Sequence, residues 1–411
     1  MSSKERPLSV VFVDDDDRLL DEWRGKWQEA CPKGKAVLED NKTADTKSEI
    51  FQLSTARHGT RKDPRHVVAE TPLFNKADLV LVDYDLIELE QSTALTGEDI
   101  AYLLRCFTTC GVIVLLNPPD LGTNFFDLRL RRSMDSWADL QLGTDQLGNG
   151  WLWNKVPEGF APWHWPQLLE MVERRRRQVA EMRSALDKVA LDTIGIPEEV
   201  RASLDHSMTD VLTARRVGKP AGVKPLTARE FVLKSEYGVH RKDRPAFKGA
   251  DEQMARIAAA RMSSWLESVV LPGQNVLVDA PHLVRRSPGL LSGDQDKVGS
   301  WNATAVRESD AASRAVRSPD LSQYRFKKET WLSRPAWFWP LVASSKRFME
   351  WAQPSTQKDF VFCEDTSAFC PRSEAHEFMA DVPPQFSLRH VKMGTGKANP
   401  PVYRPPMRLS M

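Results

Sequence analysis

The sequence predicts an α/β protein whose amino-terminal part is a doubly wound parallel sheet of five strands, followed by a helical connector and an α+β region. Two observations carry this prediction. The apolar runs within 8–13 and at 79–82 are each long enough for a buried strand, and they stop at Asp14 and Asp83 respectively. Unbroken apolar runs of this kind are typical of parallel strands that helices cover on both faces.

The segments between and after these strands alternate between helical and extended patterns. In 18–29, Leu19 or Leu20 recurs with Trp23 and Trp27 at spacings of three and four, which predicts an amphipathic helix. The other elements expected in this part are short strands at 36–38 and 51–53, helices at 97–105 and 125–134, and strands at 111–117 and 152–157.

The helix expected after Pro166 is the start of a connector. Its apolar residues follow a heptad-like pattern, which predicts either a helix that pairs with its copy in a homodimer through 166–190 or a helix packed on its own domain. Gly195 and Pro197 should end it. We therefore expect a first domain at 1–165, a connector and linker at 166–225 and an output domain at 226–411. The heptad-like residues are Leu168, Val172, Val179, Met182, Leu186 and Val189.

Length and composition are those of a soluble globular protein. The chain has 411 residues, of which 41% are hydrophobic and 27% charged. No apolar stretch approaches the ~20 residues that span a bilayer, and the first residues lack the apolar core of a signal peptide, so we expect a cytoplasmic protein without a membrane partner. The five cysteines are irregularly spaced, which favours reduced thiols.

Charge is divided unevenly along the chain. Residues 1–195 hold 25 Lys and Arg against 32 Asp and Glu, a balance of −7, while residues 196–411 hold 32 against 24, a balance of +8. Either the two halves attract each other, or the second half faces nucleic acid or an acidic protein.

Carboxylates at the ends of two parallel strands should meet at one edge of the sheet. Strand ends of this kind are where open α/β sheets bind ligands. Asp14, Asp15 and Asp83 would repel one another unless a cation lay among them, and their hard oxygen atoms suit Mg²⁺.

With these features the first ~180 residues resemble the receiver domain of two-component response regulators, which has a flavodoxin-like fold. The residues that carry the resemblance are Asp14 and Asp15 after the first strand, Asp83 after the third, the Gly-led helix at 97–105, the strand at 111–117, and Lys155 within 152–157.

The resemblance implies a phosphorelay protein, with a histidine kinase or a phosphotransfer protein as donor. Asp83 would be the phosphoacceptor, assisted by Lys155 and Asn117. Asp14, Asp15, Asp83 and the backbone carbonyl of Asp85 would hold Mg²⁺. Beyond this phosphoacceptor chemistry, we do not expect an enzyme.

Departures from the family keep a second function open. Asn117 stands where a Ser or Thr is usual, and Val156 separates Lys155 from Pro157. The alternative is a receiver that is not phosphorylated and serves as a protein interaction module.

The second half offers weaker signals. Strand-end acids would allow a receiver-gated nuclease, although capping or surface carboxylates explain them as well; these acids are Asp279, Glu364 and Asp365. A further group has the residue types of a zinc site but no standard spacing, which favours ordinary thiols and histidines; it comprises Cys363, Cys370, His376 and His390.

Overall fold

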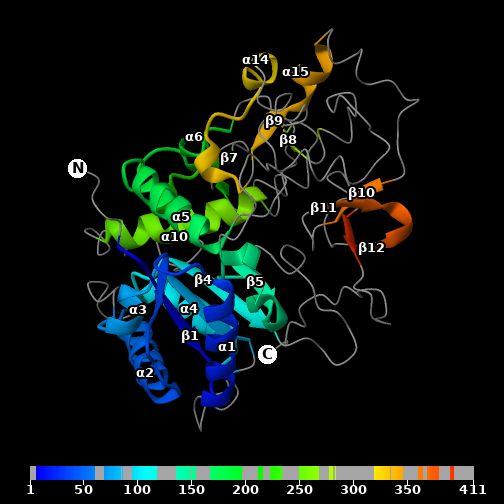
Figure 1. Cartoon of the computed structure of the whole chain (residues 1–411). Helices are drawn as coiled ribbons and strands as arrows, with labels where there is room; N and C mark the ends of the chain where they lie inside the picture. The colour runs from blue at the N-terminus through cyan, green and yellow to red at the C-terminus, as the bar shows by residue number, and fades with distance from the viewer. Residues whose placement is uncertain are drawn as a thin grey trace, which may run out of the picture.

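A computed structural model gives the structure of this chain (Figure 1). It describes residues 6–60, 69–84, 86, 95–117, 136–148, 150–153, 167–196, 212–215, 223–233, 250–267, 277–280, 283, 319–333, 335–345, 360–363, 368–378 and 389–392.

The first part of the chain forms a parallel sheet of five strands in the order β2-β1-β3-β4-β5. This is the strand order of flavodoxin-like doubly wound folds, so the predicted α/β architecture is confirmed. The elements are β1 (Leu8–Val13), α1 (Asp17–Ala30), β2 (Ala36–Leu38), α2 (Thr43–Thr60), α3 (Pro72–Lys76), β3 (Leu79–Asp83), α4 (Gly97–Phe107), β4 (Val112–Asn117), β5 (Leu140–Gly143) and α5 (Leu168–Arg183).

Alternate residues of the strands pack into two hydrophobic layers, one on each face of the sheet. Val10 and Phe12 of β1 face a cluster built with α1 and the start of α5. Val11 and Val13 face a second cluster, which includes residues of α2, α3 and α4. The sheet is therefore covered on both faces, which explains why its strands are apolar throughout.

Two predicted strands are wrong. Residues 51–53 belong to α2, where Ile50 and Leu53 lie one turn apart and are buried in the core. The fifth strand of the sheet is β5 and not the predicted segment: residues 152 and 153 belong to the 3₁₀ helix η2 (Gly150–Trp153), which follows η1 (Thr144–Gly148), and 154–157 lie outside the described residues. Burial of Trp153 against Trp27 of α1 holds η2 on the helical layer rather than in the sheet. The helix predicted at 125–134 lies outside the described residues.

The predicted connector helix is shorter than expected. Helix α5 ends at Arg183, and after a turn α6 (Ala190–Thr193) follows. Helix α5 packs against α10 (Asp251–Trp265), as Figure 1 shows. Of the residues of the expected dimer seam, Val179, Met182 and Leu186 are buried in the cluster that includes α10. Leu168 and Val172 are buried in the other layer, and Val189 is partly buried. The helix is thus packed on its own chain, and a homodimer through 166–190 stays a prediction.

The arginine run at 174–177 ties α5 to the sheet. Arg175 donates to Asp139, which precedes β5, with an Nη2–Oδ1 distance of 2.6 Å, and Arg176 donates to Asp78, which precedes β3, at 2.7 Å. Asp139 also accepts from Arg105 of α4 at 2.5 Å and from the backbone N–H of Ile113 at 2.8 Å. One buried carboxylate thus joins α4, α5 and the amino ends of β4 and β5.

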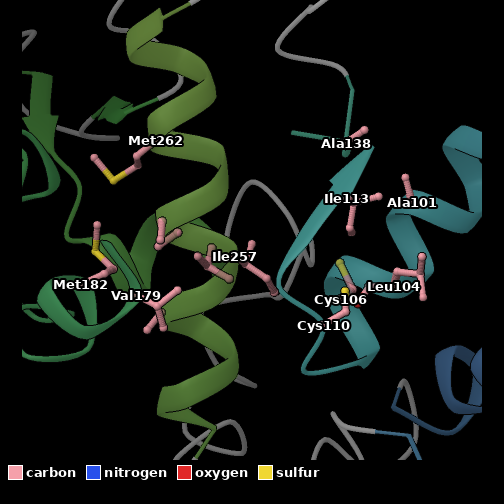
Figure 2. Packing of buried hydrophobic residues seen from close by; sticks show 14 of the residues in the cluster. Ala101, Leu104, Cys106, Cys110, Ile113, Ala138, Val179, Met182, Ile257 and Met262 are labelled. Carbon is pink, nitrogen blue, oxygen red and sulfur yellow. Dashed lines mark hydrogen bonds between the residues drawn. The ribbon is translucent and has the colours of Figure 1, made fainter. Parts of the chain in front are cut away.

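The second half of the chain shares its core with the first. Figure 2 shows residues of α4, α5 and α10 within one hydrophobic cluster, which also reaches Trp331 and Ala336. Helix α9 (Ala228–Phe231) packs on α10 as well. The expected division into 1–165, 166–225 and 226–411 stays a prediction, but this core crosses both boundaries.

The remaining described elements form three small sheets and short helices. The pair β6–β7 lies within the predicted linker. The bounds of these remaining elements are β6 (Thr213–Arg215), β7 (Val223–Pro225), β8 (Leu277–Asp279), α14 (Pro319–Ser322), η8 (Glu329–Trp331), β9 (Ala336–Phe338), α15 (Trp339–Ser344), β10 (Phe360–Cys363), β11 (Ala368–Pro371), η10 (Arg372–Glu374), β12 (Ala375–Phe378) and β13 (Arg389–Lys392).

Ion pairs join the two halves. Arg229 Nε lies 2.8 Å from Asp187 Oδ1, and Lys328 Nζ lies 3.5 Å from Glu181 Oε2. These contacts agree with an attraction between the halves, while an acidic external partner stays a prediction. Among the described helices, none is long and apolar enough to cross a membrane.

Candidate functional site

Two of the predicted site residues lie side by side at the carboxyl edge of the sheet. Strands β1 and β3 are neighbours, and Val13 pairs with Val82. The next residues are Asp14 and Asp83, which are both buried, with 1% and 8% of their surface exposed. Because the chain leaves β1 toward β2 on one side and β3 lies on the other, this is the topological switch point of the sheet, where doubly wound folds bind their ligands.

The surroundings of Asp14 disfavour the charged form of its carboxyl group. The pKa of its carboxyl group is raised from 3.8 to about 7, mainly by burial and in smaller part by the negative charges of Asp83 and Asp15, while the hydrogen bond from the Asp16 backbone opposes the rise. The Asp16 N–H donates to Asp14 Oδ1 at 2.7 Å, whereas the buried Oδ2 accepts no hydrogen bond. An oxygen in this position favours a proton or a cation as its partner.

The carboxylates of Asp16 and Asp17 stabilise the start of α1 and its contact with Thr43. Asp16 caps α1, since its side chain accepts from the Arg18 N–H at 2.8 Å, and Asp17 accepts from the Thr43 N–H at 2.9 Å. These hydrogen bonds lower the pKa of both carboxyl groups. Asp16 is therefore the N-cap residue of α1. Thr43, which sequence reasoning missed, also donates from Oγ1 to the Asp14 carbonyl at 3.3 Å.

Helix α4 begins directly against the Asp83 backbone. Thr96 and Asp99 form a capping box at its start, and the Gly97 N–H donates to the Tyr84 carbonyl at 2.9 Å. A Cβ atom on Gly97 would lie 2.4 Å from the Asp83 carbonyl oxygen and 2.9 Å from the Tyr84 Cα. Only glycine therefore permits this close approach between the helix and the strand end.

We expect Gly97→Ala to lower the free energy of unfolding by about 1–3 kcal/mol, because the new methyl group has to push α4 away from backbone atoms that cannot rotate aside. Urea denaturation followed by circular dichroism measures the change. The matched control is Gly25→Ala in α1, where a Cβ atom meets nothing within 4 Å, and where alanine should be neutral or stabilising. Equal stability of the two variants would contradict the close packing of α4 on Asp83.

The other predicted site residues are placed only in part. Asn117 ends β4 and pairs with Gly143 of β5, so its backbone lies at the same edge of the sheet as Asp83. Lys155 and Asp85 lie outside the described residues. The carboxyl end of β5 carries Gly143 and Thr144, and this strand is not the one that was predicted to bear the lysine.

The same edge has some of the features of a cation site. In the part of the chain that the structure describes, no three His, Cys, Asp or Glu side chains are arranged to hold a metal ion as they stand. Asp14 and Asp83 nevertheless fit a hard cation chemically, because two carboxylates lie at adjacent strand ends and one buried oxygen has no hydrogen-bond donor. The predicted carbonyl ligand, Asp85, lies outside the described residues.

The candidates of the second half do not form a site within the described ranges. Asp279 ends β8 and is buried, and Glu364 and Asp365, its expected partners, lie outside the described residues. Cys370 is a buried free thiol. In the four-stranded sheet, Cys363 is the strand partner of His390, while His376 pairs with Val391.

Comparison with models of protein families, with curated proteins and with solved structures finds no match to this chain.

Proposed function

We propose that this chain is a response-regulator-like signalling protein in which Asp83 accepts a phosphoryl group with the help of Mg²⁺. The observation that carries the proposal is that Asp14 and Asp83 directly follow the paired residues Val13 and Val82, at the switch point of a sheet with the strand order β2-β1-β3-β4-β5. The donor would be a histidine kinase or a phosphotransfer protein, and the signal would pass to the second half of the chain.

In this proposal each residue has a distinct task. A carboxylate oxygen of Asp83 attacks the phosphorus atom of the donor, the bond from phosphorus to the donor breaks, and the donor keeps that electron pair. Mg²⁺, when bound, neutralises negative charge on the phosphoryl oxygens. Asp14 and Asp15 would hold it with Asp83 and the carbonyl of Asp85. Asp14 has to lose its proton to do so, which is easier above pH 7 because its pKa is about 7.

We expect the intact mass of the protein to rise by one phosphoryl group after incubation with acetyl phosphate and Mg²⁺, and the rise to vanish in Asp83→Asn. The matched control is Asp16→Asn, which removes a carboxylate two residues from Asp14 but keeps a side chain that caps α1. A mass gain in Asp83→Asn equal to that of the unmodified protein, or no Mg²⁺-dependent gain at all, would overturn the proposal.

One observation favours a second candidate function. The family resemblance requires a lysine at the carboxyl end of the fifth strand, and the observed β5 ends in Gly143. An ammonium group at this edge would neutralise charge in phosphoryl transfer, and the described residues of β5 and η1, 140–148, contain no lysine. The alternative is an interaction module that is not phosphorylated. Binding of beryllofluoride with Mg²⁺, read by tryptophan fluorescence, separates the two, since only a phosphoacceptor site should bind it.

A further inference from the structure

The four-stranded sheet of the second half places three chemically different residues in one row. Its strand order is β11-β10-β13-β12, and β10, β11 and β12 are labelled in Figure 1. Cys363 of β10 is the register partner of His390 of β13, and His390 is the register partner of Glu377 of β12. Register partners on neighbouring strands share one face of a sheet, and neighbouring strands are about 4.8 Å apart. A cysteine, a histidine and a glutamate therefore occupy consecutive positions of one row.

The order within this row is the one that nucleophilic catalysis requires. A thiol becomes a strong nucleophile when a histidine beside it accepts its proton, and a third group on the other side of the histidine orients the imidazole. Strand β13 lies between β10 and β12, so His390 is the middle member of the row. In any other order the histidine would have only one of the two partners beside it.

The register also divides the residues whose types resemble a zinc site. His376 stands one position before Glu377 in β12, and successive residues of a strand lie on opposite faces, so His376 and the row are on different faces of the sheet. Cys370 lies on β11, two strands away from His390. A zinc ion binds nitrogen and sulfur at about 2.0–2.3 Å, so one ion does not join these positions. The sheet therefore groups Cys363 and His390 with Glu377.

The position of Cys363 suits a reactive thiol. Cys363 is the last residue of β10, so the row lies at the end of that strand and not in its middle. Lys392 stands two positions after His390 in β13 and shares its face. A cation near a cysteine favours the thiolate, which is the nucleophilic form. Cys370, in contrast, is 2% exposed and packs against Ala375, which is the environment of an unreactive thiol.

We propose that Cys363, His390 and Glu377 form a second site, at which the thiol attacks the carbonyl carbon of an acyl compound such as an ester. This activity does not depend on the Asp14–Asp83 site. It also goes beyond the expectation from the sequence, which was that the chain is no enzyme apart from its phosphoacceptor chemistry.

The proposed reaction has two steps. His390 takes the proton of the Cys363 thiol, the sulfur bonds to the carbonyl carbon, and the bond from that carbon to the leaving oxygen breaks; the oxygen keeps the electron pair and receives the proton from His390. Water then attacks the thioester and gives a proton to His390. The bond from carbon to sulfur breaks, and the sulfur keeps the electron pair and takes that proton back. Glu377 is a positioning residue that stabilises the protonated histidine.

The first test measures alkylation of the full chain by iodoacetamide at pH 7, with peptide mass spectrometry to assign each modified cysteine. We expect Cys363 to react at least about fivefold faster in the folded protein than in the urea-denatured chain, because an ordinary thiol is only a few per cent ionised at this pH. Greater exposure does not explain such a gain, since the denatured chain exposes every thiol. Cys370 should react more slowly in the folded protein.

Two results of this measurement overturn the proposal. One is a rate for Cys363 at or below that of the denatured chain, which would make it an ordinary thiol. The other is alkylation of Cys363 that begins only after treatment with a chelator, because the thiol would then be the ligand of a metal ion.

Matched histidine variants separate the row from the rest of the sheet. His390→Ala should lower the alkylation rate of Cys363 at least about fivefold, toward that of the denatured chain. The control is His376→Ala, which should leave the rate unchanged because its position is on the other face. Slow alkylation of Cys370 in both variants shows that the sheet is intact. Equal rates for Cys363 in the two variants overturn the role of His390.

The reaction itself is tested with p-nitrophenyl acetate. We expect a burst of p-nitrophenolate and a mass gain of one acetyl group on Cys363, both absent in Cys363→Ala. Glu377→Gln should slow turnover at least about tenfold, and Glu377→Asp should keep part of it. Glu374→Gln is the control, because Glu374 is exposed in η10. A lack of acetyl groups on Cys363, or equal turnover in Glu377→Gln and Glu374→Gln, overturns the proposed site.

Discussion

Replacing Asp139 by Asn should lower the free energy of unfolding by about 3–5 kcal/mol, the usual cost of leaving a buried charge without its partner. The side chains of Arg105, Arg175 and Asp139 are 1%, 7% and 2% exposed, so water cannot replace the lost carboxylate. Two guanidinium groups would then face each other in the core. The midpoint of urea denaturation measures the effect.

The matched control is Asp187→Asn, because Asp187 also binds an arginine, Arg229, but its side chain is 78% exposed. Exposed ion pairs contribute about 0–1 kcal/mol, so this variant should lie close to the unmodified protein. A loss below about 1 kcal/mol in Asp139→Asn would mean that the two arginines find other acceptors. In that case Asp139 would not be the residue that fastens α5 to the sheet.

Asp14→Asn should stabilise the protein at pH 8, by up to about 4 kcal/mol, since a pKa raised by one corresponds to about 1.4 kcal/mol. The raised pKa of Asp14, about 7, means that the folded protein prefers the protonated carboxyl. This contribution to stability is fully present below pH 3.8 and is lost as pH rises through 7. Asparagine imitates the neutral form of the carboxyl at every pH.

Thermal unfolding of both proteins between pH 4 and pH 8 tests this expectation. The advantage of Asp14→Asn should be largest at pH 8 and should vanish near pH 4. At pH 8, Mg²⁺ should raise the melting temperature of the unmodified protein and leave that of the variant unchanged, since a bound cation replaces the proton. An asparagine variant that is less stable at pH 8 would show that Asp14 is charged and satisfied in the fold.

Together these results would separate two roles of acidic residues in the sheet. Asp139 at the amino edge would hold elements together, while Asp14 at the carboxyl edge would destabilise the fold where the proposed function needs a cation. Active sites commonly carry such local conflicts, because groups placed for chemistry are not placed for stability.

The sequence by itself determined the sheet strands that are long and apolar and the carboxylates at their ends. β1, β3 and β4 lie where their patterns predict them, since an unbroken apolar run with a charged boundary is a local signal. Helix α1 follows from the spacing of its tryptophans in the same way. The meeting of Asp14 and Asp83 then follows from the parallel pairing of β1 with β3.

Only the tertiary structure decided which segment closes the sheet and what covers the connector helix. The strand β5 has four residues and lies at the edge, so its pattern is too short to outweigh the lysine-bearing segment at 152–157. The apolar pattern of α5 does not indicate whether a second copy or α10 covers it, because the hydrophobic effect is not directional and favours burial against either surface. Likewise, in the sequence the arginine run at 174–177 only interrupts the apolar pattern of the helix. The tertiary structure places Asp139 and Asp78, which are distant in sequence, beside it.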